Sequence, residues 1–212
     1  MKKVPLTTYV LDLWPENLYS VLKIQNKFLR GLVKSTSHWH YRRCDKLIAM
    51  SPSLNDTLVK ITGKAPEKVA TIPQYCEKFY EQDIHNIELE EKYKNYFKIV
   101  YAGNISPAQN VEVAVDAAVL LKKDGIKDIK FIIVGDGMSK KDIEAYVEKQ
   151  GVVEYFDFLG SKPVTDMPVY HTLADALFAP LAKSDDLGLT IPAKVTSYMA
   201  GGKPVLTCID GE

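Results

Sequence analysis

The stretch that decides the fold runs from Pro180 to Leu206 and reads PLAKSDDLGLTIPAKVTSYMAGGKPVL. It places Gly188 and Leu189 just before an expected helix start near Pro192, and it closes on glycines ahead of an apolar run. Free backbone N–H groups at a helix N-terminus form an anion site, and a preceding glycine lets a bulky anion approach the backbone. We therefore expect an anion-binding loop here, for which a nucleotide diphosphate is one candidate ligand.

The sequence before and around this loop alternates regularly between apolar strands and helices. The expected strands are FKIVYAG, KFIIVGDG, YFDFLG, DALFAPL and KPVLTCID, and the expected helices cover residues 109–123, 139–150 with a Ser139/Asp142 capping box and a stop at Gly151, 167–173, and a segment from about 192. This alternation is typical of a parallel sheet with crossover helices. Ligands of such open α/β sheets bind at the carboxyl ends of the strands, so we expect the site there.

The first part of the chain shows the same alternation on a smaller scale. A strand ending near Leu11 is followed by a helix from Pro15 to about Gly31 and by a second helical piece, HWHYRRC. The strand DKLIAMS, a helix capped by Ser51 that stops at Gly63, and the strand KVATIP follow. Residues 77–96 are charged and aperiodic. We therefore predict a partial domain over 1–76, a linker over 77–96 and a second, Rossmann-like domain over 97–212.

Composition excludes several functional classes. The 212 residues contain 27 Lys plus Arg and 27 Asp plus Glu, so no net field would attract nucleic acid. The three cysteines are scattered without paired spacing, which argues against a metal cage and favours a reducing, cytoplasmic compartment. No apolar run is long enough to span a membrane. The first domain is too short to be self-sufficient and the chain stops directly after a strand, so we expect both ends to be cut.

Eight segments in a fixed order resemble the landmarks of the group 1 (family 4) glycosyltransferases. They are DLWPENL, DKLIAMSPSLNDTL, KVATIPQ, YAGNISPAQNVEVAVDAAVLL, FIIVGDG, FDFLG, ADALFAPL and IPAKVTSYMAGGKPVL. The resemblance covers nearly the whole chain and implies a GT-B fold, with two Rossmann-like domains. It implies that residues 97–212 bind the nucleotide-sugar donor and that residues 1–76 are part of the acceptor side. Because members of this family are much longer, the resemblance also implies a fragment.

The resemblance assigns the donor-site residues. Backbone N–H groups of Gly188, Leu189 and Thr190 would hold the diphosphate, and Gly160, Ser161 and Lys162 would contact the base. The family carries two glutamates in this region, but this chain has Leu189 and Ser197 at the matching positions, so Asp185 or Asp186 would take the first role and Ser197 the contact to the ribose. Gly103 and Asn104 stand where relatives place a cation. Either the backbone and Asn104 hold the phosphate alone, or Lys194 supplies the charge; a surface lysine is the other interpretation of Lys194. Gly135 is expected in a structural turn that lines the cleft.

Two features of the first part have an open interpretation. Asp12, at the end of a strand beside Trp14, either binds or deprotonates the acceptor or orders the turn before a helix. The stretch from His38 to Arg43 forms either an aromatic and basic face toward a lipid phosphate or a half-buried helix. His38 and His40 point apart on a helix and cannot share a metal.

The resemblance therefore implies a hexosyltransferase, retaining in mechanism, that transfers sugar from a nucleoside diphosphate sugar, most simply a UDP-sugar. The acceptor would be a polysaccharide or lipid-linked glycan at the cytoplasmic face of the membrane, with peripheral membrane contact, no metal and no other cofactor. Asp12 and Asp186 are the catalytic candidates. The alternative is a non-catalytic, glycosyltransferase-like fragment that binds a nucleotide or a partner. We expect the 212-residue chain itself to bind nucleotide weakly and to transfer no sugar.

Overall fold

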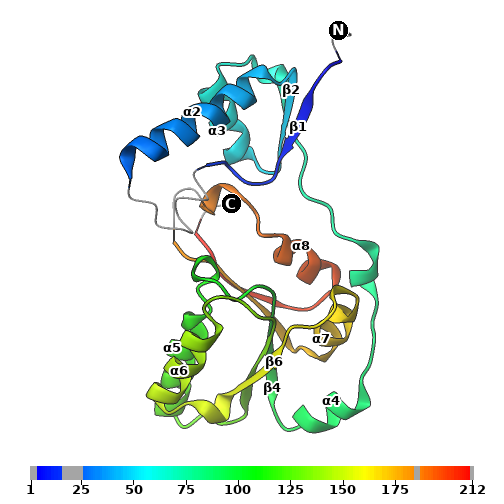
Figure 1. The fold of residues 1–212 in the computed structure, drawn as a ribbon. Helices are drawn as coiled ribbons and strands as arrows, with labels where there is room; N and C mark the ends of the chain where they lie inside the picture. Colours follow the sequence, from blue (N-terminus) through cyan, green and yellow to red (C-terminus); the bar gives the residue numbers. More distant parts are fainter. Residues whose placement is uncertain (1–3, 16–25, 184–186, 211–212) are drawn as a thin grey trace. The chain divides into compact units, whose positions relative to one another are not determined.

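The computed structural model describes residues 4–15, 26–183 and 187–210 (Figure 1). Its contacts divide the chain into two units. The first contains the described residues up to Tyr75 together with Lys183–Pro192 and Asp210, and the second contains 76–182 and 193–209. The loop at residues 183–192 thus belongs to the first unit, although it lies within the predicted second domain. The predicted domain boundaries otherwise stay a prediction.

The second unit is built on a five-stranded parallel sheet. Its strands are β4 (Phe97–Ala102), β5 (Ile129–Val134), β6 (Phe156–Gly160), β7 (Ala176–Pro180) and β8 (Val205–Cys208). The spatial order is β6-β5-β4-β7-β8, and all four pairings are parallel. The parallel sheet predicted from the strand and helix alternation is therefore confirmed.

Helices cover both faces of this sheet, because alternate residues of each strand point to opposite sides. Ile99 and Tyr101 pack with α5 (Glu112–Lys123) and α6 (Lys140–Gln150) in one buried cluster. Val100 and Ala102 pack in a second cluster with α4 (Ile87–Tyr93), α7 (Met167–Leu173) and α8 (Ala193–Ala200). Figure 1 shows α5 and α6 on one side of the sheet and α7 and α8 on the other. The central strands are buried on both faces, which explains their continuous apolar sequences.

The first unit has a smaller parallel sheet of three strands, β1 (Thr7–Val10), β2 (Lys46–Ala49) and β3 (Val69–Thr71), in the order β1-β2-β3. Helices α2 (Lys27–Arg43) and α3 (Pro52–Thr62) pack with one buried cluster. The predicted limits of α3 are confirmed. The Ser51 side chain accepts a hydrogen bond from the Leu54 N–H, and Gly63 ends the helix with a φ of 66° in the left-handed region.

The structure corrects one predicted helix limit and one predicted helix cap. The helix predicted to end near Gly31 instead begins at Lys27, where Asn26 caps the N–H groups of Phe28 and Leu29, and it continues to Arg43. A glycine inside a helix costs only about 1 kcal/mol, so Gly31 does not end it. Residues 16–25 of the predicted helix lie outside the described residues. The predicted capping box of α6 is also wrong, because Ser139 adopts a helical conformation and its side chain makes no cap hydrogen bond.

The predicted linker contributes to the second unit. It contains a 3-10 turn at Lys78–Glu81 and the helix α4, whose Tyr93 is only 1% exposed within the second unit's core. The Tyr93 hydroxyl donates to Asp157 at 2.7 Å, and Lys92 forms an ion pair with the same carboxylate at 2.8 Å. Only Leu89 and Tyr93, one turn apart, connect this short helix to the apolar core. Two residues are too few to show a helical hydrophobic periodicity in the sequence.

Candidate functional site

A pocket of about 320 Å³ opens at the carboxyl edge of the second unit's sheet, close to the lower limit of roughly 300 Å³ for small-molecule sites. We call it the sheet-edge pocket. Six of its residues come from the sequence prediction: Gly103, Asn104, Gly135, Ser161, Lys162 and Ser197. The others are Tyr80, Ala102, Val134, Asp136, Val164, Met167, His171 and Tyr198. The pocket thus lies where ligands of open α/β sheets bind.

Glycines let three strand ends meet at the floor of this pocket. Gly135 has a φ of 147°, and a Cβ atom on it would overlap the carbonyl oxygen of Gly103. The Gly135 N–H donates to the Gly160 carbonyl at 2.9 Å, and the Gly103 N–H donates to the Val134 carbonyl at 2.9 Å. The backbone can therefore be approached closely here by a ligand, because no side chain covers it. Gly160 does not line the pocket itself; its carbonyl accepts the hydrogen bond from the Gly135 N–H.

Beside Ala102, the side chain of Tyr198 takes the place of the backbone hydrogen bonds between β4 and β7. The pairing of β4 with β7 includes Ile99 and Val100 but stops before Ala102. The hydroxyl of Tyr198 then accepts from the Ala102 N–H at 2.8 Å and donates to the Ala102 carbonyl at 3.0 Å. Burial raises the pKa of this hydroxyl. Because both backbone groups are satisfied, β4 and β7 can separate at the pocket without leaving unpaired buried polar atoms.

An aromatic wall, which the sequence analysis did not include, closes one side of the sheet-edge pocket. The ring of Tyr80 stacks on His171 with centroids 5.5 Å apart, and His171 meets Tyr198 edge-on at 5.2 Å. His171 is 2% exposed, its Nδ1 has no hydrogen-bond partner, and burial lowers its pKa to about 4. It is therefore neutral at physiological pH. No motif marks these residues, since they come from a connecting segment and from two helix faces.

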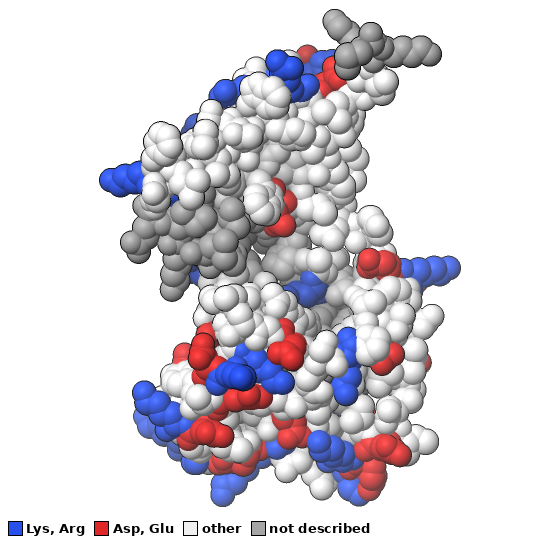
Figure 2. Space-filling view, in the orientation of Figure 1, with Lys and Arg blue, Asp and Glu red and all other residues white. Residues whose placement is uncertain are grey.

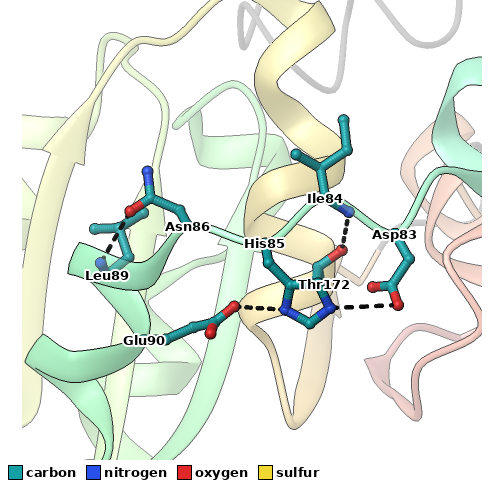
Figure 3. Close-up of polar contacts among 7 residues, drawn as sticks. All are labelled: Asp83, Ile84, His85, Asn86, Leu89, Glu90 and Thr172. Atoms are coloured by element: carbon teal, nitrogen blue, oxygen red, sulfur yellow. Dashed lines mark hydrogen bonds and ion pairs between the residues drawn. The ribbon is translucent and has the colours of Figure 1, made fainter.

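Polar contacts fix the segment that carries Tyr80 against α7 (Figure 3). The Ile84 N–H donates to the Thr172 hydroxyl at 3.0 Å, next to His171 in sequence. The His85 ring lies between Glu90, with Nδ1 to Oε1 at 2.7 Å, and Asp83, with Nε2 to Oδ2 at 3.6 Å. The hydrogen bond and charge of Glu90, and then the charge of Asp83, raise the pKa of His85. These contacts hold the connecting segment beside the pocket wall.

Lys194 is a half-buried amine next to the pocket floor and not a freely solvated surface lysine. Its Nζ donates to the Tyr101 hydroxyl at 3.2 Å and to Gln109 Oε1, and it lies 4.3 Å from the centre of the Tyr101 ring. A Cβ atom on Gly103 would lie 3.9 Å from Lys194 Cε. Burial lowers the pKa of the ammonium to about 7. Ser197, one turn later, donates from its hydroxyl to the Lys194 carbonyl at 2.9 Å and keeps its lone pairs as acceptors.

The predicted anion loop is anchored in the first unit. Gly188 and Leu189 lie in a 3-10 turn at Leu187–Leu189, and the buried Thr190 follows. The Ser51 hydroxyl donates to the Leu189 carbonyl at 2.5 Å, and the side chains of Leu189 and Ile191 pack against the first unit's core. Helix α8 begins only at Ala193. Asp186 and Asp185 lie outside the described residues, so the predicted catalytic role of Asp186 stays a prediction.

Asp12 lies in a second hollow, in the first unit, between the carboxyl end of β1 and one face of α2. We call it the aromatic hollow; its volume is about 610 Å³, and its lining residues are Thr8, Tyr9, Val10, Leu11, Asp12, Trp14, Thr36, Ser37, Trp39, His40 and Tyr41. Both tryptophans of the chain therefore line it, each about half exposed. The Trp14 N–H donates to the Tyr41 hydroxyl at 3.1 Å. Its described lining contains a carboxylate and an imidazole but no Lys or Arg.

The basic residues near this hollow have internal partners. Arg42 donates to the Ile61 carbonyl at 3.2 and 3.3 Å, and the guanidinium of Arg43 lies 4.7 Å from the Trp39 ring centre. On the face drawn in Figure 2, blue and red side chains intermingle over the second unit, with no patch of a single sign. Among the described residues, no cluster of His, Cys, Asp and Glu could hold a metal ion, and no helix could cross a membrane.

The comparisons with known proteins agree with the fold. The model of the family "Glycosyl transferases group 1" matches residues 83–210, which is more than half of the chain. The chain therefore belongs to the group 1 glycosyltransferase family. The chain is also 24% identical over 197 residues to a 2-deoxystreptamine glucosyltransferase of Streptomyces kanamyceticus, covering 87% of this chain and 50% of that protein.

Solved structures show the same fold. The Anabaena protein HepE in complex with UDP and glucose matches with a TM-score of 0.73 at 16% identity, over 96% of this chain and 52% of that chain. WaaG, a glycosyltransferase involved in lipopolysaccharide biosynthesis, matches with a TM-score of 0.69 at 17% identity, over 95% and 55%. The chain thus spans about half the length of these proteins. The predicted family and the GT-B fold class are confirmed.

Proposed function

We propose that the chain carries the donor site and part of the acceptor side of a glycosyltransferase that uses a nucleoside diphosphate sugar. The observation that carries the proposal is the sheet-edge pocket, whose glycine floor lies at the strand ends of the second unit. The fold neighbour HepE was solved with UDP and glucose, which supports UDP-sugar as the donor. The transfer breaks the bond from the anomeric carbon to the diphosphate oxygen and forms a bond to an acceptor hydroxyl oxygen.

The proposal gives roles to several residues of the sheet-edge pocket, to Gly160 and Lys194 beside it, and to Asp12 in the first unit. The bare backbone at Gly103 and Gly135, with Asn104, holds the diphosphate, and Lys194 supplies the positive charge that stabilises the leaving group. Gly160, Ser161 and Lys162 contact the base, and the Ser197 hydroxyl accepts from the ribose. The contact of the diphosphate with the backbone of Gly188, Leu189 and Thr190 stays a prediction from the sequence. Asp12 takes the proton of the acceptor hydroxyl. The transfer is proposed to retain configuration, and Asp186 is the second catalytic candidate.

The donor site can be tested by titrating the 212-residue chain with UDP-glucose and following backbone amide shifts by NMR. We expect the amides of residues 103–104, 135–136 and 160–162 to shift together. Gly103→Val should abolish the response, because a side chain would stand on the pocket floor, whereas Gly125→Ala, in a turn away from the pocket, should leave it intact. Shifts confined to another surface would contradict the proposed donor site.

The acceptor is proposed to bind in the aromatic hollow. Indole faces stack on the apolar faces of sugar rings, and the hydroxyls of Thr36 and Ser37 and the Asp12 carboxylate offer hydrogen-bond partners. The absence of Lys and Arg from the described lining favours the glycan part of a polysaccharide or lipid-linked acceptor over a phosphate group. Such an acceptor would place the protein at the cytoplasmic face of the membrane, in peripheral contact with it.

Tryptophan fluorescence reports on this hollow alone, because the chain has no tryptophan other than Trp14 and Trp39. We expect glycan acceptors to change the emission and UDP-glucose to leave it nearly unchanged. Asp12→Asn should weaken sugar transfer by the full-length protein without changing donor binding. Equal responses to the acceptor and to a free phosphate salt would contradict a carbohydrate site.

One observation favours the alternative of a non-catalytic nucleotide-binding or partner-binding fragment. Leu189 and Ser197 occupy the two positions at which the family carries glutamates, so this chain lacks that acidic pair. A radiolabelled-sugar transfer assay separates the two proposals, with a full-length relative as the positive control. We expect donor binding but no turnover by the 212-residue chain. Holding both reactants together can lower the barrier to transfer by roughly 7–11 kcal/mol, and a chain with only part of the acceptor side would lose this contribution. Turnover equal to the control would overturn this expectation.

A further inference from the structure

Lys194 has only neutral hydrogen-bond partners among the described residues. Its Nζ donates to the Tyr101 hydroxyl and to the Gln109 amide oxygen and lies over the Tyr101 ring. Ion pairs elsewhere in the second unit join Lys92 to Asp157 and Lys98 to Asp175, but no described carboxylate forms one with Lys194. A half-buried amine usually has an anionic partner, because neutral groups offset only part of the lost hydration of the ammonium.

The two neutral partners are themselves held in place. The Tyr101 hydroxyl donates to the Asn104 carbonyl at 2.5 Å, which directs its lone pairs toward Lys194 and links the amine to the pocket floor. Gln109 ends the 3-10 turn Pro107–Gln109, and the next residue, Asn110, has a φ of 48°, in the left-handed region that Asn tolerates. The Ala182 N–H donates to the Ala108 carbonyl at 2.8 Å and ties this turn to the end of β7. The amine is thus positioned by rigid elements on two sides.

We infer that Gln109 and Tyr101 are positioning residues that hold Lys194 beside Gly103 without a carboxylate, so that the donor diphosphate becomes its anionic partner and is bound together with a proton. This inference rests on the proposed function, because the diphosphate is the ligand. A proton moves from solvent to the Lys194 amine, and no other bond changes. The affinity for the donor would therefore depend on pH near neutrality, and the phosphates would not have to displace a carboxylate from Lys194.

The charged and titratable groups around Lys194 are consistent with this linkage. Burial lowers the pKa of Lys194 to about 7, and none of the charged residues that the structure describes offsets this effect. Burial, then the charges of Tyr198 and Glu112, raise the pKa of Tyr101 above its usual range, so that Tyr101 stays neutral. Gln109 does not titrate, and Ser197 and the buried Tyr198 hydroxyl are the neighbouring polar groups on α8. Lys194 is thus the group of this cluster that changes charge near pH 7.

The first experiment measures the ionisation of Lys194 directly in the 212-residue chain. Lysine side chains are labelled with 13C, and the Lys194 Cε resonance is identified by its absence from Lys194→Met. We expect it to titrate about three pH units below the other lysines and to move upward when UDP-glucose is added. Gln109→Glu should raise the free midpoint toward that of an ordinary lysine, because it introduces the missing carboxylate. A free midpoint shared with the exposed lysines would overturn the inference.

The second experiment measures the affinity for UDP-glucose by calorimetry, since its two phosphates stay ionised throughout the range. Affinity should fall about tenfold between about pH 6 and about pH 8 as the free amine loses its proton. Lys194→Arg should remove this dependence because arginine stays charged, and Lys194→Met should weaken binding at the lower pH by about 10- to 100-fold. Lys127→Met, at an exposed lysine in the α5–β5 turn, is the matched control.

The outcomes separate this inference from the proposed function. Absence of UDP-glucose binding at every pH would overturn both the proposed donor site and the linked proton uptake. Binding that is independent of pH, together with a normal Lys194 midpoint, would overturn the inference alone. A near-neutral midpoint that rises on UDP-glucose binding and in Gln109→Glu would support it.

Discussion

The two sheets of this protein bury their strands in different ways. The five-stranded sheet has helices on both faces, and alternate residues of β4 and β5 enter two separate buried clusters. The three-stranded sheet packs one face in a single cluster, while Tyr9 and Ala70 on the other face are exposed. In the first arrangement, backbone hydrogen bonds between neighbouring strands hold the strand ends in place, as at Gly103 and Gly135. The second leaves one face of its sheet uncovered, so that the ring of Tyr9 stays exposed.

The largest effect should come from adding one methyl group to the floor of the sheet-edge pocket. Gly135→Ala would place a Cβ atom in overlap with the Gly103 carbonyl, at a φ of 147° that L-residues rarely adopt. We expect a loss of at least about 3 kcal/mol in unfolding free energy, measured by hydrogen exchange of β4 and β5 amides in urea. Gly125→Ala, which has open space around it but a φ of 75°, should cost only about 1 kcal/mol from backbone strain. Equal costs would refute the close approach of the strand ends.

The next prediction asks whether α4 belongs to the second unit. Tyr93→Ala removes a side chain that is 1% exposed and a hydrogen bond to Asp157, so it should destabilise the unit by about 3–5 kcal/mol. Tyr75→Ala, at a side chain that is 75% exposed, should change stability by less than about 0.5 kcal/mol. If residues 77–96 acted only as a linker, both substitutions would have the same small effect. Urea unfolding monitored by far-UV circular dichroism measures the difference.

The third prediction concerns pH. The folded-state pKa of His171, about 4, lies below its ordinary value of 6.5, so the unfolded chain binds more protons between these values. Stability should therefore fall as pH drops from about 6.5 toward 4, by about 2 kcal/mol at pH 5, and this loss should be complete below pH 4. His171→Phe should remove this part of the acid sensitivity while keeping a ring against Tyr80. An unchanged pH profile in that variant would assign the effect to other groups.

The smallest effect is expected at His85, which is exposed between two carboxylates. Its raised pKa means that the stabilisation from this pairing is present below the ordinary value and is lost as pH rises through the raised one. Glu90→Gln should move the NMR titration midpoint of the imidazole downward, and Glu88→Gln, on the same helix, serves as the control. High salt should shrink the difference, since solvent screens the pair. Identical midpoints in the two variants would argue against the Glu90 contact.

The sequence predicted the second unit more completely than the first. All five strands were predictable because each is a short apolar run that ends near Gly, Pro or Asp. The pocket glycines were predictable because they follow such runs directly. Tyr80, His171 and Tyr198 were not, since no local pattern shows which helix faces meet at a strand end. Gly31 was misread because a single helix glycine is tolerated when little packs against it. The partners of Lys194 were not predictable either, nor was the position of Trp14 and Trp39 in one hollow. Both depend on contacts between segments that are distant in the sequence.

The assignment of residues 183–192 to the first unit limits how this protein can be recombined with a relative. The chain leaves the second unit after β7, packs Leu189 and Ile191 into the first unit's core, and returns to start α8. A chimera that takes the whole region after Tyr96 from a relative would import a foreign loop and lose the hydrogen bond from Ser51 to the Leu189 carbonyl. Replacing the second unit by grafting therefore requires two splice points, one on each side of residues 183–192, so that this loop stays with its native first unit; a single crossover cannot achieve this.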